Sequence, residues 1–139
     1  MPSPKPVLAL LHGWGMNGRM FDALADLLAA CLLESLRQIE AGEARRERLR
    51  SHIVQLREGL ADLKPGVLMP SDTPIQPLVI GANADAVQLS QSLLQRGLLV
   101  PAIRTPTVPV NTARLRITLS AAHSADDVAK LIEALHAVA

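Results

Sequence analysis

Residues 114–119 read Arg-Leu-Arg-Ile-Thr-Leu, a strict alternation of polar and apolar side chains. Successive side chains of a β-strand point to opposite faces, so Leu115, Ile117 and Leu119 share one face. The other face carries two arginines and a threonine. This pattern predicts a strand that buries its apolar face and leaves its polar face without a covering helix.

A helix is predicted directly after this strand. Ser124 and Asp127 have the spacing of a capping box in which aspartate replaces the usual glutamate. His123, which precedes the cap, is interpreted as a structural residue. Apolar residues then recur at helical spacing at Val128, Leu131, Ile132, Leu135 and Val138.

Two further strands are predicted on the N-terminal side of residues 114–119. Residues 98–103 follow Gly97, which is expected to end a helix over residues 83–96. Residues 75–81, IQPLVIG, form the other apolar run. Because proline lacks an N–H group, Pro77 predicts that this strand lies at the edge of the sheet or contains a bulge.

Leucine and isoleucine at positions 49, 53, 56, 60 and 63 predict an amphipathic helix that ends at Pro65-Gly66. The arginines and glutamates between them are expected to form a solvated face with local ion pairs. An alternative is that this apolar stripe docks onto a partner protein. His52 and His136 also lie in predicted helices, and nothing in the sequence converges on them.

The N-terminal region predicts a strand, a turn and a helix. Residues 7–11, VLALL, would form a short buried strand that ends in the turn His12-Gly13-Trp14-Gly15. His12 is interpreted as a residue that stabilises the turn. Apolar residues then recur at helical spacing from Met20, and the helix is expected to continue to Ile39.

The composition excludes several classes of function. The chain has 139 residues, a net charge of +1, one tryptophan, one phenylalanine and no tyrosine. This favours neither a base-stacking surface nor a strong attraction to nucleic acid or anionic membranes. Cys31 is the only cysteine, so neither an internal disulfide nor a cysteine-based zinc site is possible. No apolar run approaches the length of a membrane span, and we expect a cytoplasmic protein.

The order of elements predicts an α/β fold of the α+β type. We expect a small sheet of about three strands with helices packed on one face, preceded by the N-terminal strand, turn and helix.

Residues 32–139 resemble the C-terminal domain of the 8-amino-7-oxononanoate synthases, pyridoxal-phosphate-dependent α-oxoamine synthases of biotin biosynthesis. The resemblance implies the small C-terminal domain of a fold-type I enzyme. It rests on matching residues in order along the chain, namely Ser71, Pro74-Ile75-Gln76-Pro77, Gly81, Arg96-Gly97-Leu98-Leu99-Val100, Ala102-Ile103-Arg104, Pro106-Thr107-Val108-Pro109, Thr112-Ala113-Arg114-Leu115-Arg116 and Ala121-Ala122-His123.

Two positions depart from the family's pattern. Thr105 stands where a second proline is usual, and Asn111 stands where the loop usually has glycine. Asparagine adopts a positive φ more readily than most residues, so we expect the loop to keep its conformation.

The resemblance implies that this domain folds over the cofactor and offers arginine to a substrate carboxylate. Arg104 and Arg116 match the carboxylate-contacting positions, and Thr107 is a neighbouring hydroxyl donor. A guanidinium group suits this task because it donates two parallel hydrogen bonds and keeps its charge. Pro106 and Pro109 would stiffen the loop, while Arg114 is interpreted as structural.

Residues 1–31 resemble the start of the α/β-hydrolases, particularly the pimeloyl-carrier-protein methyl ester esterases. In that family the residue after the His-Gly pair contributes a backbone N–H to the oxyanion hole, which places a vestigial position at Trp14. An active hydrolase needs a G-x-S-x-G elbow, and this sequence has none. We therefore predict two segments, 1–31 and 32–139, that form a fusion.

No catalytic or metal-binding residue is predicted. The family's cofactor-holding lysine and acidic residue lie in its large domain, and Lys5, Lys64 and Lys130 do not match the lysine motif. The chain is expected to bind no pyridoxal phosphate alone and to be an inactive fragment of a synthase. Its parent reaction joins L-alanine to a pimeloyl thioester with loss of carbon dioxide. A non-catalytic interaction module and a truncated pimeloyl esterase are the alternatives.

The expected partners are a separate large domain or a second copy of the chain, and a small carboxylate. Neither nucleic acid nor membrane is expected as a partner. Residues 7–28 would dock loosely on the remaining chain or drive self-association.

Overall fold

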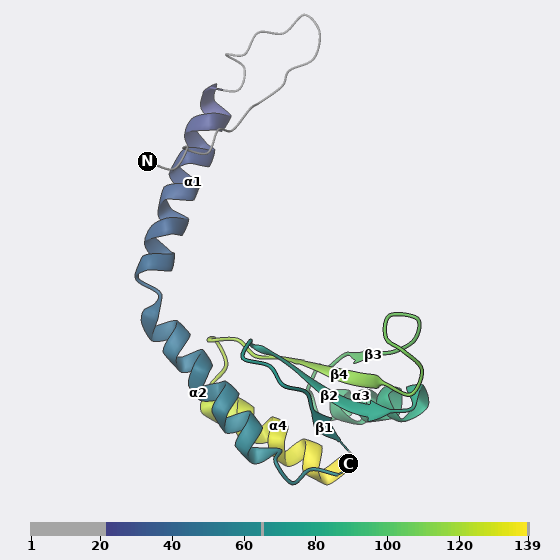
Figure 1. The fold of residues 1–139 in the computed structure, drawn as a ribbon. Helices are drawn as coiled ribbons and strands as arrows, with labels where there is room; N and C mark the ends of the chain where they lie inside the picture. The colour runs from purple at the N-terminus through teal and green to yellow at the C-terminus, as the bar shows by residue number, and fades with distance from the viewer. Residues whose placement is uncertain (1–21, 65, 139) are drawn as a thin grey trace, which may run out of the picture. The chain divides into compact units, whose positions relative to one another are not determined.

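The computed structural model describes residues 22–64 and 66–138. The predicted strand at residues 7–11, the turn with His12 and the position at Trp14 lie outside the described residues. The elements are shown in Figure 1. In chain order they are α1 (Asp22–Glu40), α2 (Glu43–Gly59), β1 (Val67–Leu68), β2 (Ile75–Gly81), α3 (Asn83–Gln95), β3 (Ala102–Ile103), β4 (Ala113–Thr118) and α4 (Ala125–Val138).

The chain divides into two compact units, Met1–Glu43 and Ala44–Ala139. The predicted boundary between residues 31 and 32 concerns sequence resemblance, and it remains a prediction. In the first unit, α1 confirms the helix that was expected to continue to Ile39. Six of its large apolar side chains are exposed, namely Leu24, Leu27, Leu32, Leu33, Leu36 and Ile39.

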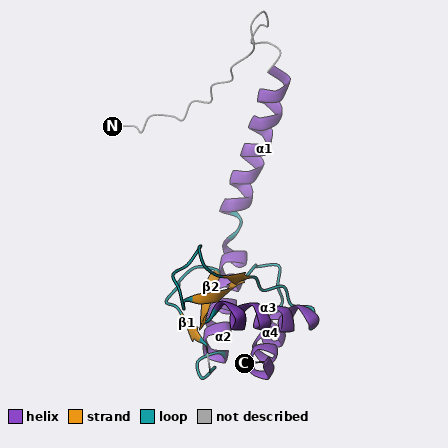
Figure 2. Cartoon of the chain, turned by 90° about the vertical axis from the view of Figure 1, so that its right-hand side faces the viewer, coloured by secondary structure: helices purple, strands orange, loops and turns teal. Residues whose placement is uncertain are grey.

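The second unit is built on one antiparallel sheet in the order β1-β2-β4-β3. The sheet has four strands, where the sequence predicted about three. The additional strand is β1, which has two residues and pairs Val67 with Val79 and Leu68 with Leu78. Such a short strand has no periodicity of its own, and only pairing with β2 defines it. Helices α2, α3 and α4 lie on one side of the sheet, as predicted (Figure 2).

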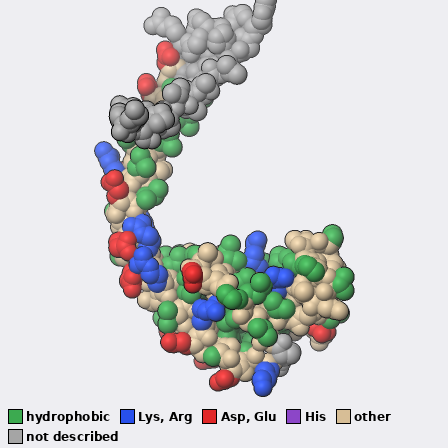
Figure 3. All heavy atoms as spheres, in the orientation of Figure 1, with side chains coloured by type: hydrophobic (Ala, Val, Ile, Leu, Met, Phe, Trp, Pro, Cys, Tyr) green, Lys and Arg blue, Asp and Glu red, His purple; other side chains and the backbone are tan. Residues whose placement is uncertain are grey.

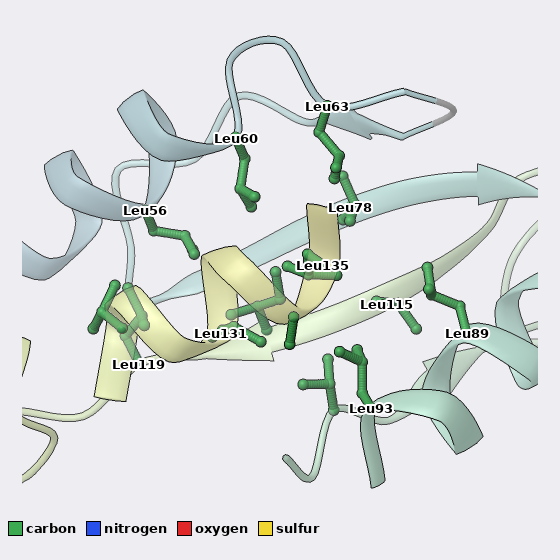
Figure 4. Close-up of a cluster of buried hydrophobic side chains, with 14 residues drawn as sticks. Leu56, Leu60, Leu63, Leu78, Leu89, Leu93, Leu115, Leu119, Leu131 and Leu135 are labelled. Carbon is green, nitrogen blue, oxygen red and sulfur yellow. The ribbon is translucent and has the colours of Figure 1, made fainter. Parts of the chain in front are cut away.

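The apolar core lies between these three helices and the sheet (Figure 4). The alternation along β4 is confirmed, because Leu115, Ile117 and Leu119 are buried and Arg116 is exposed. Fully buried side chains from the other elements complete the core, namely Leu56 of α2, Leu78 of β2, Leu93 of α3, and Val128 and Leu135 of α4.

The apolar stripe of residues 49–63 lies in this core. Leu56, Leu60 and Leu63 are buried, and Leu49 and Ile53 pack against them. The stripe is therefore covered within its own unit, and the alternative in which it docks onto a partner is wrong. The predicted solvated face is confirmed by the exposed pair of Arg50 and Glu47, whose N–O distance is 2.7 Å.

Helix α2 ends at Gly59, six residues before Pro65, where the sequence predicted its end. A Cβ atom at Gly59 would lie 2.6 Å from Cδ1 of Ile132, so glycine allows α2 and α4 to approach closely here. The backbone continues in turns, with hydrogen bonds from Leu60 N to Leu56 O and from Leu63 N to Leu60 O. These turns keep Leu60 and Leu63 in the core although they lie beyond the helix.

The strand predicted over residues 98–103 is shorter than expected, because only Ala102 and Ile103 pair with β4. Gly97 ends α3 as predicted, with a φ of 81°. The amide of Leu98 still donates to the carbonyl of Leu93 at 2.9 Å, which closes the end of the helix. The backbone at Leu98 is therefore engaged with α3 and is not available to the sheet.

Of the two alternatives predicted for the strand of Pro77, the edge position is wrong, whereas an irregularity of the bulge type is present in the strand, away from Pro77. Strand β2 pairs with β1 on one side and with β4 on the other, and its register shift lies between Val79 and Gly81. The amide of Met69 donates to the carbonyl of Pro77 at 3.0 Å. The ring nitrogen of Pro77 therefore faces Met69 just beyond the end of β1, where a missing N–H interrupts only the end of the ladder.

Candidate functional site

We call the face of the sheet opposite α2, α3 and α4 the helix-free face of the second unit, and Arg116 lies on it. It pairs with Pro77 of β2, and its amide donates to the carbonyl of Pro101 at 2.9 Å. The side chain is exposed, and among the described residues its guanidinium group makes no hydrogen bond or ion pair. Basic side chains stand among hydrophobic ones on this unit in Figure 3. Arg116 is therefore held by its backbone, while its charged group is free to meet a ligand.

Arg114 points to the same face but is used within the fold. Its Nε donates to the carbonyl of Thr112 at 3.1 Å, and Nη2 donates to Thr112 Oγ1 at 3.3 Å. Its Nη1 lies 3.0 Å from Sδ of Met69. These contacts agree with the structural role that was predicted for Arg114.

Arg104 begins the loop between β3 and β4. Its carbonyl accepts hydrogen bonds from the amides of Thr107 at 3.0 Å and of Val108 at 3.4 Å. Its exposed side chain lines an open hollow with residues of α3, namely Asn83, Ala84, Val87, Gln88 and Gln91. No described hydrogen bond or ion pair occupies its guanidinium group.

No described side-chain contact joins the three predicted site residues, although the backbone amide of Thr107 donates to the carbonyl of Arg104. Arg104 lies beside α3, Arg116 lies on the helix-free face, and the side chain of Thr107 is exposed without a described partner. Their role in binding a carboxylate therefore remains a prediction.

The two departures from the family's pattern both have a structural consequence. Asn111 has a φ of 61°, as expected for a residue that replaces glycine in this loop. Thr105 Oγ1 accepts a hydrogen bond from Asn83 Nδ2 at 2.7 Å, and the Thr105 amide lies 3.5 Å from Asn83 Oδ1. Proline at position 105 would offer neither group, so threonine ties the loop to α3.

The sequence missed the contacts of two histidines. His52 is only 4% exposed, and its Nε2 lies 2.9 Å from the carbonyl of His123. His136 Nε2 lies 2.8 Å from the carbonyl of Gly59, at the end of α2. A signal existed for His52, because it lies three residues after Leu49 and four before Leu56, on the buried side of the helix.

The capping box of α4 forms as predicted. The amide and hydroxyl of Ser124 donate to Asp127 Oδ2 at 2.9 and 2.8 Å, and the amide of Asp127 donates to Ser124 Oγ at 3.1 Å. The backbone hydrogen bond from Ser124 and then its hydroxyl lower the pKa of Asp127 below 3.8. Asp127 is thus a helix cap, and His123 supports the same turn by accepting from the Ser120 amide.

The described residues do not fit a bound pyridoxal phosphate. The cofactor needs a lysine and an acidic partner that converge on its ring. Lys64 and Lys130 are exposed, and the hollow beside Lys64 is lined by Arg57 and apolar residues. In residues 22–64 and 66–138, no three His, Cys, Asp or Glu side chains form a group that could hold a metal ion. Within the same ranges, no helix combines the length and apolarity that crossing a membrane requires.

Comparisons with known proteins agree with the sequence resemblance. The 8-amino-7-oxononanoate synthase of Thiobacillus denitrificans is 69% identical over 117 residues, which are 84% of this chain and 30% of that protein. The solved serine palmitoyltransferase of Sphingomonas wittichii covers 76% of this chain and 27% of its own, with a TM-score of 0.70 and 28% identity. A solved structure of SPT with a PLP internal aldimine has a TM-score of 0.70 and 27% identity, over 76% of this chain and 27% of its own. The parent enzymes therefore depend on pyridoxal phosphate.

The chain thus resembles part of a synthase, and it spans about 30% of the length of the curated relatives that it matches. The family model for aminotransferase class I and II matches residues 4–135. The chain belongs to the aminotransferase class I and II family.

Proposed function

We propose that this chain is the carboxylate-binding part of an 8-amino-7-oxononanoate synthase-like enzyme in the cytoplasm. The reaction would be the condensation of L-alanine with a pimeloyl thioester and release of carbon dioxide. Pyridoxal phosphate, held by the remaining part of such an enzyme, supplies the electron sink for this chemistry. The contribution of this chain is to bind and orient the substrate carboxylate.

The observation that carries the proposal is the contrast among the arginines that surround the sheet. Arg57 and Arg114 are engaged in hydrogen bonds within the fold. The guanidinium groups of Arg104 and Arg116 are exposed and have no partner in the described part of the chain. A carboxylate could accept two parallel hydrogen bonds from either group. Thr107, exposed on the same loop as Arg104, would add a hydroxyl donor.

Exposed apolar side chains on the helix-free face of the sheet favour a partner that covers this face. On this face Ile75 is 43% exposed and pairs with Thr118, two residues from Arg116, and Val67 of β1 is 68% exposed. Apolar side chains around a charged group favour a surface that is closed by another part of a protein. We propose that the remaining part of a synthase provides this cover, and that a second copy of the chain is the weaker alternative.

A chimera tests the proposal. Residues 32–139 replace the matching segment of the Thiobacillus denitrificans relative, and carbon dioxide release from L-alanine and pimeloyl thioester is measured. We expect an active chimera and about a tenfold or larger loss in Arg116→Ala, because a charge-assisted hydrogen bond contributes about 1.5–3 kcal/mol. Arg96→Ala is the matched control, since Arg96 is exposed at the end of α3.

Full activity of the chimera with Arg116→Ala, equal to that with the control Arg96→Ala, would overturn the role of Arg116. An inactive chimera that still binds pyridoxal phosphate and folds would show that this chain no longer serves the reaction.

A further inference from the structure

A proline inside β2 leaves one backbone carbonyl without its usual donor. Met69 and Pro77 lie opposite each other, and the Met69 amide donates to the Pro77 carbonyl at 3.0 Å. Residues paired in this way normally exchange two hydrogen bonds. Pro77 has no N–H group, so it cannot return a bond to the carbonyl of Met69.

Arg57 of α2 supplies the missing donor. Its Nη1 donates to the carbonyl of Met69 at 3.1 Å and to Oε1 of Gln76 at 2.7 Å. Gln76 is fully buried, and its Nε2 donates to the carbonyls of Ser71 at 3.0 Å and Thr73 at 2.6 Å. The first half of β2 is paired with β4 on one side, and on the side of β1 it is held by these two long side chains in place of a complete ladder.

This part of β2 lies directly beside Arg116. Pro77 is the cross-strand partner of Arg116, and the Arg116 amide points the other way, to the carbonyl of Pro101. Pro77 and Arg116 thus form a pair without mutual hydrogen bonds, in which Cα atoms approach to about 4.5 Å and side chains lie close. Pro77 and Arg116 are therefore cross-strand neighbours on the same face of the sheet.

We propose that Arg57 is a positioning residue for Arg116. It replaces the N–H group that Pro77 lacks, and it thereby fixes the strand segment against which the Arg116 side chain lies. The inference rests on the proposed function of Arg116 as a carboxylate-binding residue. Arg57 itself is half-buried and engaged, so it contacts no substrate.

Nuclear magnetic resonance of the ¹⁵N-labelled chain tests this positioning without any ligand. The measured quantities are the mobility of the Arg116 Nε–H group and the exchange rate of the Arg116 amide. In Arg57→Met we expect the Arg116 Nε–H group to become more mobile. We also expect the exchange rate of the Arg116 amide to rise several-fold more than the exchange rates of the amides in α4. Arg48→Met is the matched control, because Arg48 also lies on α2 and donates to a distant carbonyl, that of Ala121. It should leave Arg116 unchanged.

A second variant keeps the test decisive if Arg57→Met is too unstable to study. Pro77→Ala provides an N–H group opposite Met69, so the double variant Arg57→Met/Pro77→Ala should regain most of the order at Arg116. Order at Arg116 that is unchanged in Arg57→Met would overturn the proposal. So would a uniform rise in exchange across the unit, or a double variant that is as mobile as Arg57→Met.

A titration with sodium acetate, used as a simple carboxylate, separates this inference from the proposed function. If acetate shifts the Arg116 Nε–H signal in the unmodified chain, we expect several-fold weaker binding in Arg57→Met. If acetate shifts no Arg116 signal in the unmodified chain, the carboxylate function fails. The measurement of Arg116 mobility would then still decide the positioning role.

Discussion

At the scale of single residues, side chains of the same type differ in whether they make hydrogen bonds within the fold. Arg114 and Arg116 lie two residues apart on the same strand face, but only Arg114 is tied to Thr112 and Met69. One carboxylate, that of Asp127, is likewise engaged in hydrogen bonds within the fold. Asp127 accepts from its own cap residue, Ser124, and its pKa is lowered as a result.

The capping box leads to a prediction about pH. Because the pKa of Asp127 is lower in the folded chain than its ordinary value of 3.8, the cap stabilises the fold above that pH. This contribution is lost as the pH falls through the folded-state pKa. Melting temperatures of the chain and of Asp127→Asn should therefore differ at neutral pH and converge in acid.

Asp126→Asn is the control for this measurement, since Asp126 lies in the same first turn and makes none of these cap hydrogen bonds. A difference between Asp127→Asn and the unmodified chain that stays constant down to strong acid would contradict the role of the ionised cap.

At the scale of elements, helix α2 packs its narrow apolar stripe in the core and uses its polar side chains for hydrogen bonds to other segments. Its apolar residues pack on α4 and the sheet, and its polar side chains reach distant carbonyls. Arg48, His52 and Gln55 contact the carbonyls of Ala121, His123 and Ala125 in turn. The helix therefore holds both the core and the turn that leads into α4.

Truncation of the stripe should be costly. Leu56 is 0% exposed, so Leu56→Ala should lower the free energy of unfolding by about 2–5 kcal/mol, through lost burial and the cavity left behind. Urea denaturation measures this change. Val54→Ala on the same helix is the control, because Val54 is 53% exposed and should have a small effect. A loss of less than about 0.5 kcal/mol for Leu56→Ala would mean that the stripe does not face the core.

At the scale of the whole molecule, the second unit combines a complete core with an uncovered sheet face. The core contains buried leucines from α2, α3, α4 and the sheet. The opposite face keeps Val67 and Ile75 exposed. A chain that spans about 30% of the length of its relatives can thus fold around its own core and still leave one face of its sheet exposed, which is the face that we propose the rest of a synthase covers.

Trapping of the cofactor tests the prediction that this chain alone does not hold pyridoxal phosphate. The purified chain, mixed with pyridoxal phosphate and L-alanine and then treated with borohydride, should carry no stoichiometric cofactor on any one lysine. The reason is that Lys64 and Lys130 are exposed, and no acidic residue lines the hollow beside Lys64. Mass spectrometry of peptides measures the labelling, and the Thiobacillus denitrificans relative is the comparison. Full labelling of one lysine, Lys5 included, would show that the chain holds the cofactor itself.

Local chemistry was enough to predict much of this fold from the sequence. The alternation in residues 114–119, the cap at Ser124 and the helix end at Gly97 depend on residues within a few positions of one another. The positive φ of Asn111 likewise follows from its own side chain. The candidate residues Arg104, Thr107 and Arg116 came from the family resemblance, and the structure adds which arginines are already engaged.

The features that the sequence did not reveal depend on contacts between distant residues. Strand β1 exists only because β2 pairs with it. His52 meets a carbonyl 71 residues away, and α2 ends where Gly59 meets Ile132. Pro77 lies inside the sheet because its nitrogen faces the end of β1, where Arg57 binds the carbonyl that proline cannot. Local sequence determines which conformations a segment favours, but a missing hydrogen bond can be replaced only by a donor that tertiary packing brings into reach.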